Sequence, residues 1–270
     1  SGAIKRAAGR KHLRTWHSFD MLGEGARTMA DAQRYTDAYR AAISSLRRYD
    51  GQAVTDGDGI SIKLSAVEPR YEPTHAENIS RRLLPVLQDL ALEACRANIH
   101  LTLDAEESWR LELSLDVLDA LLARLAMIPE TRHWSGLGIA VQTYQTRAPE
   151  VINEVINLSR KYQRRLMVRL VKGAYWDSEI KRAQELGLIT YPVFTQKPAS
   201  DLCYLACAQR MLKANDEIQS AFATHNPLTL APIQWMALRE SVNEWEWQGL
   251  HGMGDTDTLY GGIGNDILYA

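Results

Sequence analysis

Charged and polar side chains stand at the ends of most short apolar runs in this 270-residue chain. Such side chains can bind anions, pair with one another or transfer protons. A charge that closes a buried strand costs free energy unless it is paired or meets a ligand, so a recurring set indicates a site. The members of the set are Asp20, Lys63, Asp104, Glu106, Glu107, Gln142, Arg169, Lys172, His225 and His251.

Several chemistries are open to this set. Two carboxylates suit a glycosidase, but Asp104 and Glu106 stand at one strand end, whereas glycosidase carboxylates face each other across a cleft. Lys63 or Lys172 could form a Schiff base. The two histidines could be zinc ligands, but a third ligand is not evident. Together with Arg169, the lysines favour an anionic partner such as a carboxylate, a phosphate or an electron-rich cofactor.

The elements that must position these residues alternate along the chain. Short apolar runs predict strands near residues 18–20, 59–63, 99–104, 138–142, 166–173, 221–225 and 247–251. Apolar residues at helical spacing predict helices at 26–49, 77–97, 113–127, 148–163, 176–187, 201–214 and 228–240. This alternation is typical of a parallel sheet, and polar residues at strand ends favour a TIM barrel. The sequence has no G-x-G-x-x-G motif after a strand and no Walker A loop, so nothing favours an open sheet over the barrel.

The composition is that of a globular α/β protein with a large core. Lys plus Arg is 31 and Asp plus Glu is 33, and this balance argues against a nucleic-acid partner. No apolar run approaches the length of a membrane span, and no signal peptide is visible. Three cysteines do not make a disulfide framework. We therefore expect a soluble, cytoplasmic protein.

The segments around the strand ends resemble the proline dehydrogenase family, in particular the domain found in bifunctional proline utilisation proteins of the PutA type. The resemblance covers about residues 15–254, and the segment RLVKGAYWDSEIKRAQ is long enough to be specific. The other matching segments are SFDMLGE (18–24), ISIKLSA (60–66), LDAEE (103–107), ATHN (223–226) and LHGMG (250–254).

The resemblance implies a distorted (β/α)8 barrel that holds FAD. It implies the oxidation of L-proline to 1-pyrroline-5-carboxylate by hydride transfer to flavin N5, the first step of proline catabolism. It also implies electron transfer to ubiquinone, peripheral contact with the inner membrane, and a pyrroline-5-carboxylate dehydrogenase domain or partner. The expected chemistry is that of an FAD-dependent oxidoreductase acting on a CH–NH bond.

The resemblance further implies a role for individual residues. The expected catalytic residues are Arg169, Asp104 and Lys63. The expected cofactor-binding residues are Gln142, Arg169, Val171, Lys172, Gly173, Ala174, Trp176, Thr224 and His225. The expected substrate-binding residues are Lys63, Asp104, Tyr175 and Leu250.

The C-terminal part departs from the family pattern. The family continues into an eighth strand and a final helix with an arginine pair that clamps the proline carboxylate. Here 16 residues follow Gly254, without such a pair. We therefore expect a barrel that lacks the eighth strand and the last helix. A flavin-binding but catalytically impaired barrel fragment is the alternative that follows.

The C-terminal tail contains two related nonamers, at 252–260 and 261–269. The second matches the calcium-binding RTX repeat, in which Asp266 would be a calcium ligand. We expect no metal site elsewhere. The predicted divisions are a basic flank at 1–14, the barrel at 15–254 and the RTX-like tail at 255–270. A calcium-binding repeat protein whose barrel is only a carrier is a further alternative.

Overall fold

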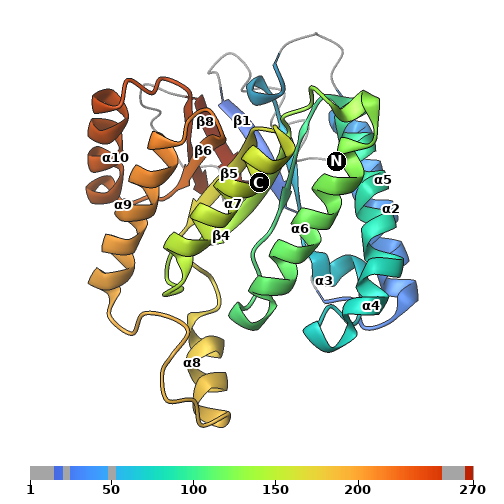
Figure 1. The fold of residues 1–270 in the computed structure, drawn as a ribbon, viewed down its shortest axis with the longest axis horizontal. Coiled ribbons are helices and arrows are strands. Elements are labelled where there is room, and N and C mark those ends of the chain that lie inside the picture. The colour runs from blue at the N-terminus through green and yellow to red at the C-terminus, as the bar shows by residue number, and fades with distance from the viewer. Residues whose placement is uncertain (1–14, 21–24, 48–52, 251–264, 270) are drawn as a thin grey trace, which may run out of the picture.

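A closed barrel of eight parallel strands forms the centre of the molecule, in the order β1 to β8 (Figure 1). The computed structural model describes residues 15–20, 25–47, 53–250 and 265–269, without the side chains of residues 15, 250 and 265–269. The strands are β1 (Thr15–Asp20), β2 (Gly59–Ile62), β3 (His100–Leu103), β4 (Leu137–Gln142), β5 (Leu166–Val171), β6 (Ile218–Ala223), β7 (Trp245–Leu250) and β8 (Asn265–Tyr269).

Helices cover the outside of this barrel. The α-helices are α2 (Met29–Leu46), α3 (Leu64–Val67), α4 (Ala76–Asn78), α5 (Leu84–Ala97), α6 (Leu111–Ala126), α7 (Ala148–Tyr162), α8 (Trp176–Glu185), α9 (Lys197–Lys213) and α10 (Pro227–Arg239). Short turns of other helix types are η2 (Val54–Asp56), η3 (Pro73–His75), η4 (Ile79–Leu83), η5 (Ser108–Arg110) and η6 (Pro129–Thr131). Figure 1 shows α8 projecting beyond the ring formed by the longer helices.

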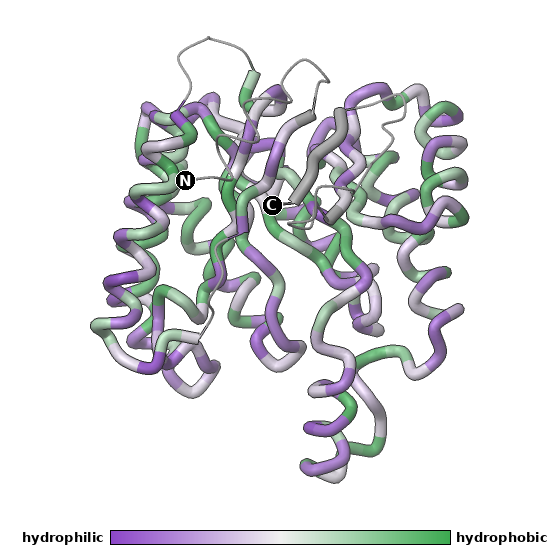
Figure 2. Tube along the Cα trace, turned by 180° about the vertical axis from the view of Figure 1, so that it is seen from behind, coloured by the Kyte–Doolittle hydropathy of each residue, from purple (hydrophilic) through white to green (hydrophobic). Residues whose placement is uncertain are grey.

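The short apolar runs form strands because both of their faces are covered. Every residue of β2, β3 and β4 is buried, as expected for parallel strands with helices outside and side chains inside the barrel. The longer helices each bury part of their residues, and hydrophilic and hydrophobic positions alternate along them (Figure 2). The predicted barrel of alternating strands and helices is therefore confirmed.

The helix predicted at 77–97 is divided in the structure. It begins as α4, passes through the π-helical turn η4 and continues as α5, with Pro85 in the first turn of α5. Proline lacks a backbone N–H, so the regular hydrogen-bond ladder cannot run unbroken through this position. Pro85 therefore stands where a helix tolerates proline.

Two predicted strands are displaced along the chain. The strand predicted at 221–225 is β6, which starts at Ile218, and the strand predicted at 247–251 is β7, which starts at Trp245. The missed residues include Gln219, Ser220 and Glu246, all of which are buried. The apolar runs do not predict where β6 and β7 begin, because the first residues of these strands include buried polar side chains.

The eighth position of the barrel is occupied, which differs from the sequence expectation. Residues 265–269 of the predicted tail form β8, whose backbone pairs with β7 on one side and β1 on the other. Without it, β7 and β1 would each present an unpaired row of backbone groups. The apolar run Ile267–Tyr269 suits a strand and closes this gap. The other residues of the predicted repeat tail, 255–264 and 270, lie outside the described residues.

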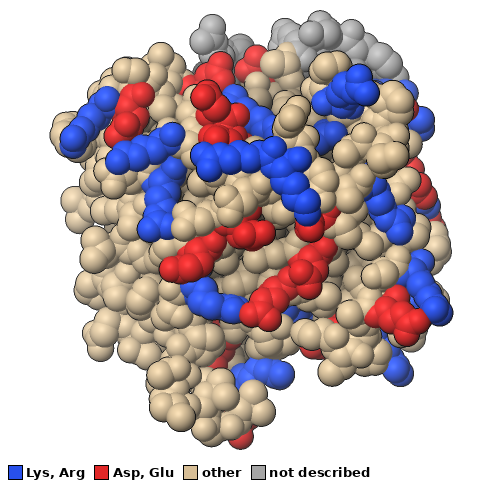
Figure 3. Space-filling view, viewed as in Figure 1, with Lys and Arg blue, Asp and Glu red and all other residues tan. Residues whose placement is uncertain are grey.

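The surface carries both signs of charge. Basic and acidic side chains are interspersed on the face shown in Figure 3. Several form ion pairs between neighbouring helices, for example Lys161 with Asp119 and Arg147 with Glu112. Within the described residues, no helix is both long and apolar enough to cross a membrane.

Candidate active site

A cavity of about 560 Å³ opens where the strands end. Its lining comes from the ends of the seven strands β1 to β7 and the loops that follow them. The lining residues are Asp20, Lys63, Asp104, Ala105, Ala140, Gln142, Arg169, Val171, Lys172, Gly173, Ala174, Tyr175, Ala223, Thr224, His225, Asn226 and Gln248. The carboxyl ends of barrel strands are where TIM-barrel enzymes build their active sites.

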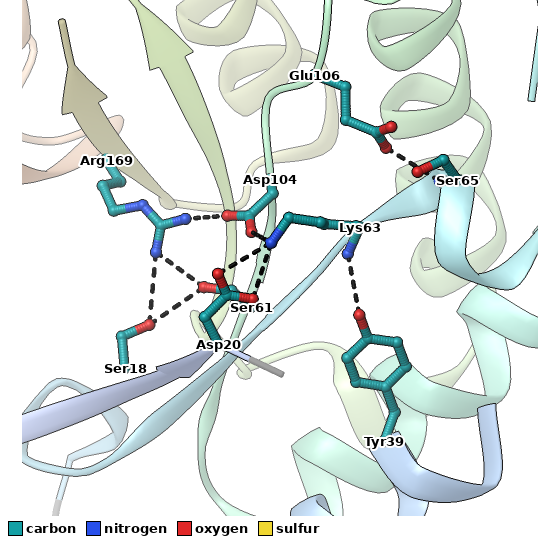
Figure 4. Close-up of polar contacts among 9 residues, drawn as sticks. All are labelled: Ser18, Asp20, Tyr39, Ser61, Lys63, Ser65, Asp104, Glu106 and Arg169. Carbon is teal, nitrogen blue, oxygen red and sulfur yellow. Dashed lines mark hydrogen bonds and ion pairs between the residues drawn. The ribbon is translucent and has the colours of Figure 1, made fainter. Parts of the chain in front are cut away.

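Arg169 on β5 is buried and lines this cavity. Figure 4 shows its guanidinium group directed toward Ser18, Ser61 and Asp104. Its neighbours in the strand register are Ala140 on β4 and Ala221 on β6, and these small side chains leave room for the guanidinium group. One end of the guanidinium group pairs with the Asp104 carboxylate, and Nη1 donates to Ser61 Oγ at 2.8 Å. Only 5% of Arg169 is exposed. Hydrogen bonds and an ion pair thus hold this buried guanidinium group in place.

Lys63 joins two carboxylates at the end of β2 (Figure 4). Its Nζ lies 2.9 Å from the Asp20 carboxylate and 3.3 Å from Asp104 Oδ2. Its backbone N–H donates to the Tyr39 hydroxyl at 3.3 Å, which anchors the strand end to α2. Asp104 thus receives one cation on each oxygen, Arg169 on Oδ1 and Lys63 on Oδ2.

Burial and charge act in opposite directions on this cluster. Burial by itself would lower the pKa of Lys63, but Asp104 and Asp20 outweigh it and the pKa is raised. Lys63 is therefore a cation at any physiological pH. Burial raises the pKa of Asp104, and the charges of Arg169 and Lys63 oppose this rise.

Gln142 ties three parts of the site together. Its Nε2 donates to the Glu106 carbonyl oxygen at 2.7 Å, and its Oε1 accepts from the Ala174 N–H at 3.3 Å. Glu106 in turn accepts from the Ser65 N–H at 3.0 Å and pairs with Arg110. The loops after β2, β3 and β5 are thus held around the end of β4.

The loop after β5 forms one lip of the cavity. Gly173 has φ of +141°, and a Cβ there would lie 2.5 Å from the Tyr144 ring, so only glycine fits. Lys172 Nζ pairs with Asp201 at 2.5 Å, and Asp201 also pairs with Lys197. The hydrogen bonds from both lysines lower the pKa of Asp201.

The neighbouring lip follows β6, the strand beside β5. The hydroxyl group of Thr224 accepts from the Asn226 N–H at 3.1 Å, and the Asn226 side chain caps α10 by accepting from the Leu228 N–H. Trp247 donates its indole N–H to the Thr224 carbonyl oxygen at 2.6 Å. These bonds shape the turn that brings Thr224 and His225 to the cavity.

Comparison with known proteins identifies the origin of this barrel. Residues 3–261 match the family described as proline dehydrogenase. The chain belongs to the proline dehydrogenase family. The predicted resemblance is therefore confirmed.

The relatives of this proline dehydrogenase-family chain are much longer. It is 48% identical over 241 residues to the bifunctional protein PutA of Escherichia coli K12, which covers 88% of this chain and 18% of that protein. It is 44% identical over 254 residues to the bifunctional protein PutA of Rhizobium meliloti, covering 94% of this chain and 20% of that protein.

Solved structures share the proline dehydrogenase-family barrel. A variant of proline utilization A from Bradyrhizobium japonicum has a TM-score of 0.85 at 48% identity, covering 94% of this chain and 26% of that one. Proline utilization A from Bdellovibrio bacteriovorus, inactivated by N-propargylglycine, has a TM-score of 0.86 at 25% identity, covering 99% of this chain and 29% of that one.

Most residues singled out from the sequence of this family member meet at the cavity. Trp176 is not among the described lining residues, because its indole N–H is turned to the Phe194 carbonyl oxygen at 2.9 Å. The side chain of Leu250 and the whole of His251 lie outside the described residues. The remaining predicted binding residues all line the cavity: Lys63, Asp104, Gln142, Arg169, Val171, Lys172, Gly173, Ala174, Tyr175, Thr224 and His225.

The structure adds residues that the site prediction left out. Asp20 stood in the strand-end set but had no role, although it contacts Lys63 directly. Ser61 holds Arg169, and Gln248 lines the cavity from β7. The alternation of side chains along a strand was the signal for both, since Ser61 stands two residues before Lys63 and Gln248 two before Leu250.

The described side chains do not form a metal cluster. Within these residues, no group of three or more His, Cys, Asp or Glu side chains is placed to hold a metal ion. The proposed calcium ligand Asp266 lies on β8, where side chains are not described.

Proposed function

We propose that this chain oxidises L-proline to 1-pyrroline-5-carboxylate with FAD bound in the cavity. The observation that carries the proposal is the cluster of Arg169, Asp104 and Lys63 at the carboxyl ends of a proline dehydrogenase-family barrel. The related proteins are named for proline utilization, which supports this substrate.

The residues present fit a planar, electron-accepting cofactor. Small side chains from several elements, among them Ala105, Ala140 and Ala223, leave space for a flat ring system. Arg169 and Lys172 supply positive charge beside that space, which suits a group that becomes more negative when it accepts electrons. FAD, when bound, supplies the hydride acceptor of the reaction.

The charged cluster would orient the substrate. Proline carries a carboxylate and an amine, and the cavity floor presents cations beside carboxylates. We assign Lys63 and Asp104, as a charge pair, to shape the proline pocket, and Arg169 to act electrostatically beside the reacting ring atoms. Tyr175 and Leu250 would pack on the proline ring.

The remaining assignments concern the cofactor. Backbone groups of the loop after β5 and side chains on both lips would surround FAD. The residues assigned to this role are Gln142, Val171, Lys172, Gly173, Ala174, Trp176, Thr224 and His225. For Trp176 this requires a contact outside the described cavity lining.

We also propose what accepts the electrons and what consumes the product of the reaction. The electrons would pass to ubiquinone, at a peripheral contact with the membrane, and the product would pass to a pyrroline-5-carboxylate dehydrogenase domain or partner. The relatives called bifunctional support the second assignment. Three free cysteines support a cytoplasmic location.

The test is the visible absorption spectrum of the purified chain with FAD, before and after anaerobic L-proline. We expect flavin bands that bleach. Flavin bands that persist would favour the impaired barrel fragment instead. The absence of flavin binding by a folded sample would overturn the proposal. Unfolding that depends on calcium would favour the repeat-protein alternative.

A further inference from the structure

Strand β7 carries a buried carboxyl group directly below the cavity. Glu246 is 0% exposed, and its Oε2 accepts from Gln248 Nε2 at 3.1 Å. Its other oxygen, Oε1, has no hydrogen-bond partner among the described residues. Gln248 lines the cavity and Glu246 does not, so the amide stands between the carboxyl group and any ligand.

The strand register shows why this pair is confined. The residue opposite Glu246 on β6 is Ala221, and the residue opposite Gln248 is Ala223. Neither methyl group can satisfy the carboxyl group. Gln219, lower on β6, also has a buried oxygen without a partner among the described residues. Among the described side chains, no donor reaches this oxygen or Glu246 Oε1. A buried acceptor without a donor costs about 1–3 kcal/mol, and a proton on Glu246 would turn one such acceptor into a donor. The register partner of Glu246 on its other side is Asn265 of β8, whose side chain is not among those described.

Charged groups of both signs act on Glu246. Among the described residues, Asp56 on η2 and Arg165 before β5 act on it in opposite directions. Arg169 lies two strands away in the same register row, with Ala221 between them. Burial raises the pKa of Glu246 to about 7, while the hydrogen bond from Gln248 lowers it in part.

We propose that Glu246 is a positioning residue that sets which end of the Gln248 amide faces the cavity. As a carboxylate, Glu246 only accepts, so Gln248 must turn Nε2 toward it and its carbonyl oxygen away. As a neutral acid, Glu246 can donate to the carbonyl oxygen of Gln248, which turns Nε2 toward the cavity.

The consequence for a ligand follows from hydrogen-bond chemistry. A flat heteroaromatic ring whose polar edge carries mostly acceptors is bound better when Gln248 presents Nε2. Affinity for such a ligand is therefore higher when Glu246 is neutral. This consequence rests on the proposed function, whereas the coupling between Glu246 and Gln248 does not.

The coupling is tested on the whole chain without cofactor. We would follow the side-chain amide signals of 15N-labelled glutamine from about pH 5 to about pH 9, assigning Gln248 by its loss in Gln248→Met. We expect the Gln248 signal to move with a midpoint near neutral pH, and this movement to vanish in Glu246→Gln. The matched control is Glu154→Gln, an exposed carboxyl group on α7.

A signal that does not move, or that moves equally in Glu246→Gln, would overturn the coupling. If Glu246→Gln does not fold, Gln248→Met gives a second test by infrared spectroscopy of the neutral carboxyl group. Loss of the Gln248 donor must then raise the midpoint at which the Glu246 band disappears, and an unchanged midpoint would refute the proposal.

The ligand consequence has a separate readout. We expect FAD to bind about tenfold more tightly at about pH 6 than at about pH 8, because Gln248 would present a donor at the lower pH and an acceptor at the higher pH. The difference must vanish in Glu246→Gln. Equal affinity at both pH values in the unaltered chain would overturn this consequence. Absence of FAD binding at every pH would instead count against the proposed function, while the amide signals still decide the coupling.

Discussion

Arg169 is held in place before any ligand arrives. Its guanidinium group is bound by Asp104 and Ser61, and Asp104 is bound again by Lys63. A preorganised cation stabilises developing negative charge without the cost of reorganisation. The arrangement explains how a fully charged side chain is tolerated inside a barrel, where an unpaired charge would be prohibitive.

Replacing Arg169 tests this role. We expect Arg169→Met to slow the reduction of bound flavin by L-proline by at least about a hundredfold, because the variant lacks the cation that we assign to a place beside the reacting atoms. The measurement is anaerobic stopped-flow absorbance, with circular dichroism to verify the fold. Arg147→Met, at an exposed ion pair with Glu112, is the control and should leave the rate unchanged. Normal flavin reduction in Arg169→Met would remove Arg169 from the mechanism.

The burial of Glu246 predicts how the free energy of unfolding depends on pH. Burial raises its pKa to about 7, above its value of about 4.3 in an unfolded chain. Such a group contributes stability that is complete below the unfolded pKa and is lost as the pH rises through the folded pKa. Ionisation should therefore lower the free energy of unfolding by about 3 kcal/mol between about pH 4 and about pH 8.

Urea denaturation across this pH range measures the contribution of Glu246. Glu246→Gln should remove this part of the pH dependence, whereas Glu154→Gln should retain it. An identical pH profile in both variants would show that Glu246 does not titrate between the two states.

At the scale of elements, α8 is attached to the loop after β3 by one buried carboxylate. Glu179 is 1% exposed and accepts from both the backbone N–H and the hydroxyl group of Ser108, each at 2.5 Å. Arg182 on the same helix lies over the Trp109 ring, 3.9 Å from its centroid. These contacts hold the loop after β5 against the loop that carries Asp104.

Removing the charge of Glu179 should loosen this attachment. We expect Glu179→Gln to lower the free energy of unfolding by about 2 kcal/mol, because a buried donor loses its charged acceptor. Amide hydrogen exchange in residues 172–185 should become faster. Glu185→Gln, at the exposed end of the same helix, is the control. Unchanged exchange in Glu179→Gln would mean that other contacts hold α8.

At the scale of the whole molecule, closure depends on β8. Its backbone pairs with β7 and β1, which are otherwise the two edges of the sheet. Unpaired edges of a sheet promote association between molecules. The barrel is therefore closed by residues whose sequence resembles a repeat of another kind.

A proline in β8 tests the closure. Ile267→Pro removes a backbone N–H from the centre of the strand, so we expect a lower midpoint of thermal unfolding and more aggregation, by light scattering. Ile267→Val keeps the N–H group and the branched side chain, and should behave like the unaltered chain. Equal behaviour of the two variants would show that β8 does not contribute to stability.

Local patterns in the sequence were sufficient to predict the alternating strands and helices as far as β7, and to group most of the residues that line the cavity. Apolar runs that end in charged residues marked the strands, because the carboxyl ends of parallel strands converge on one mouth. Lys63, Asp104 and Arg169 could be grouped for this reason before any distance was known. The boundaries of β6 and β7 could not be predicted in this way. Gln219 and Glu246 are polar, although the closed barrel buries them.

Only the tertiary structure decided which charges meet and what closes the sheet. Lys63 pairs with Asp20, 43 positions away, and with Asp104, 41 positions away, and no local pattern encodes such a choice. The contact of Gln248 with Glu246 is local, but its burial below a cavity depends on every strand around it. The sequence by itself determined the family, the alternation of elements and the chemistry at the strand ends, because these rest on residue type and spacing. Which charged side chains pair, and which residues form the eighth strand, depend on how the sheet closes into a barrel.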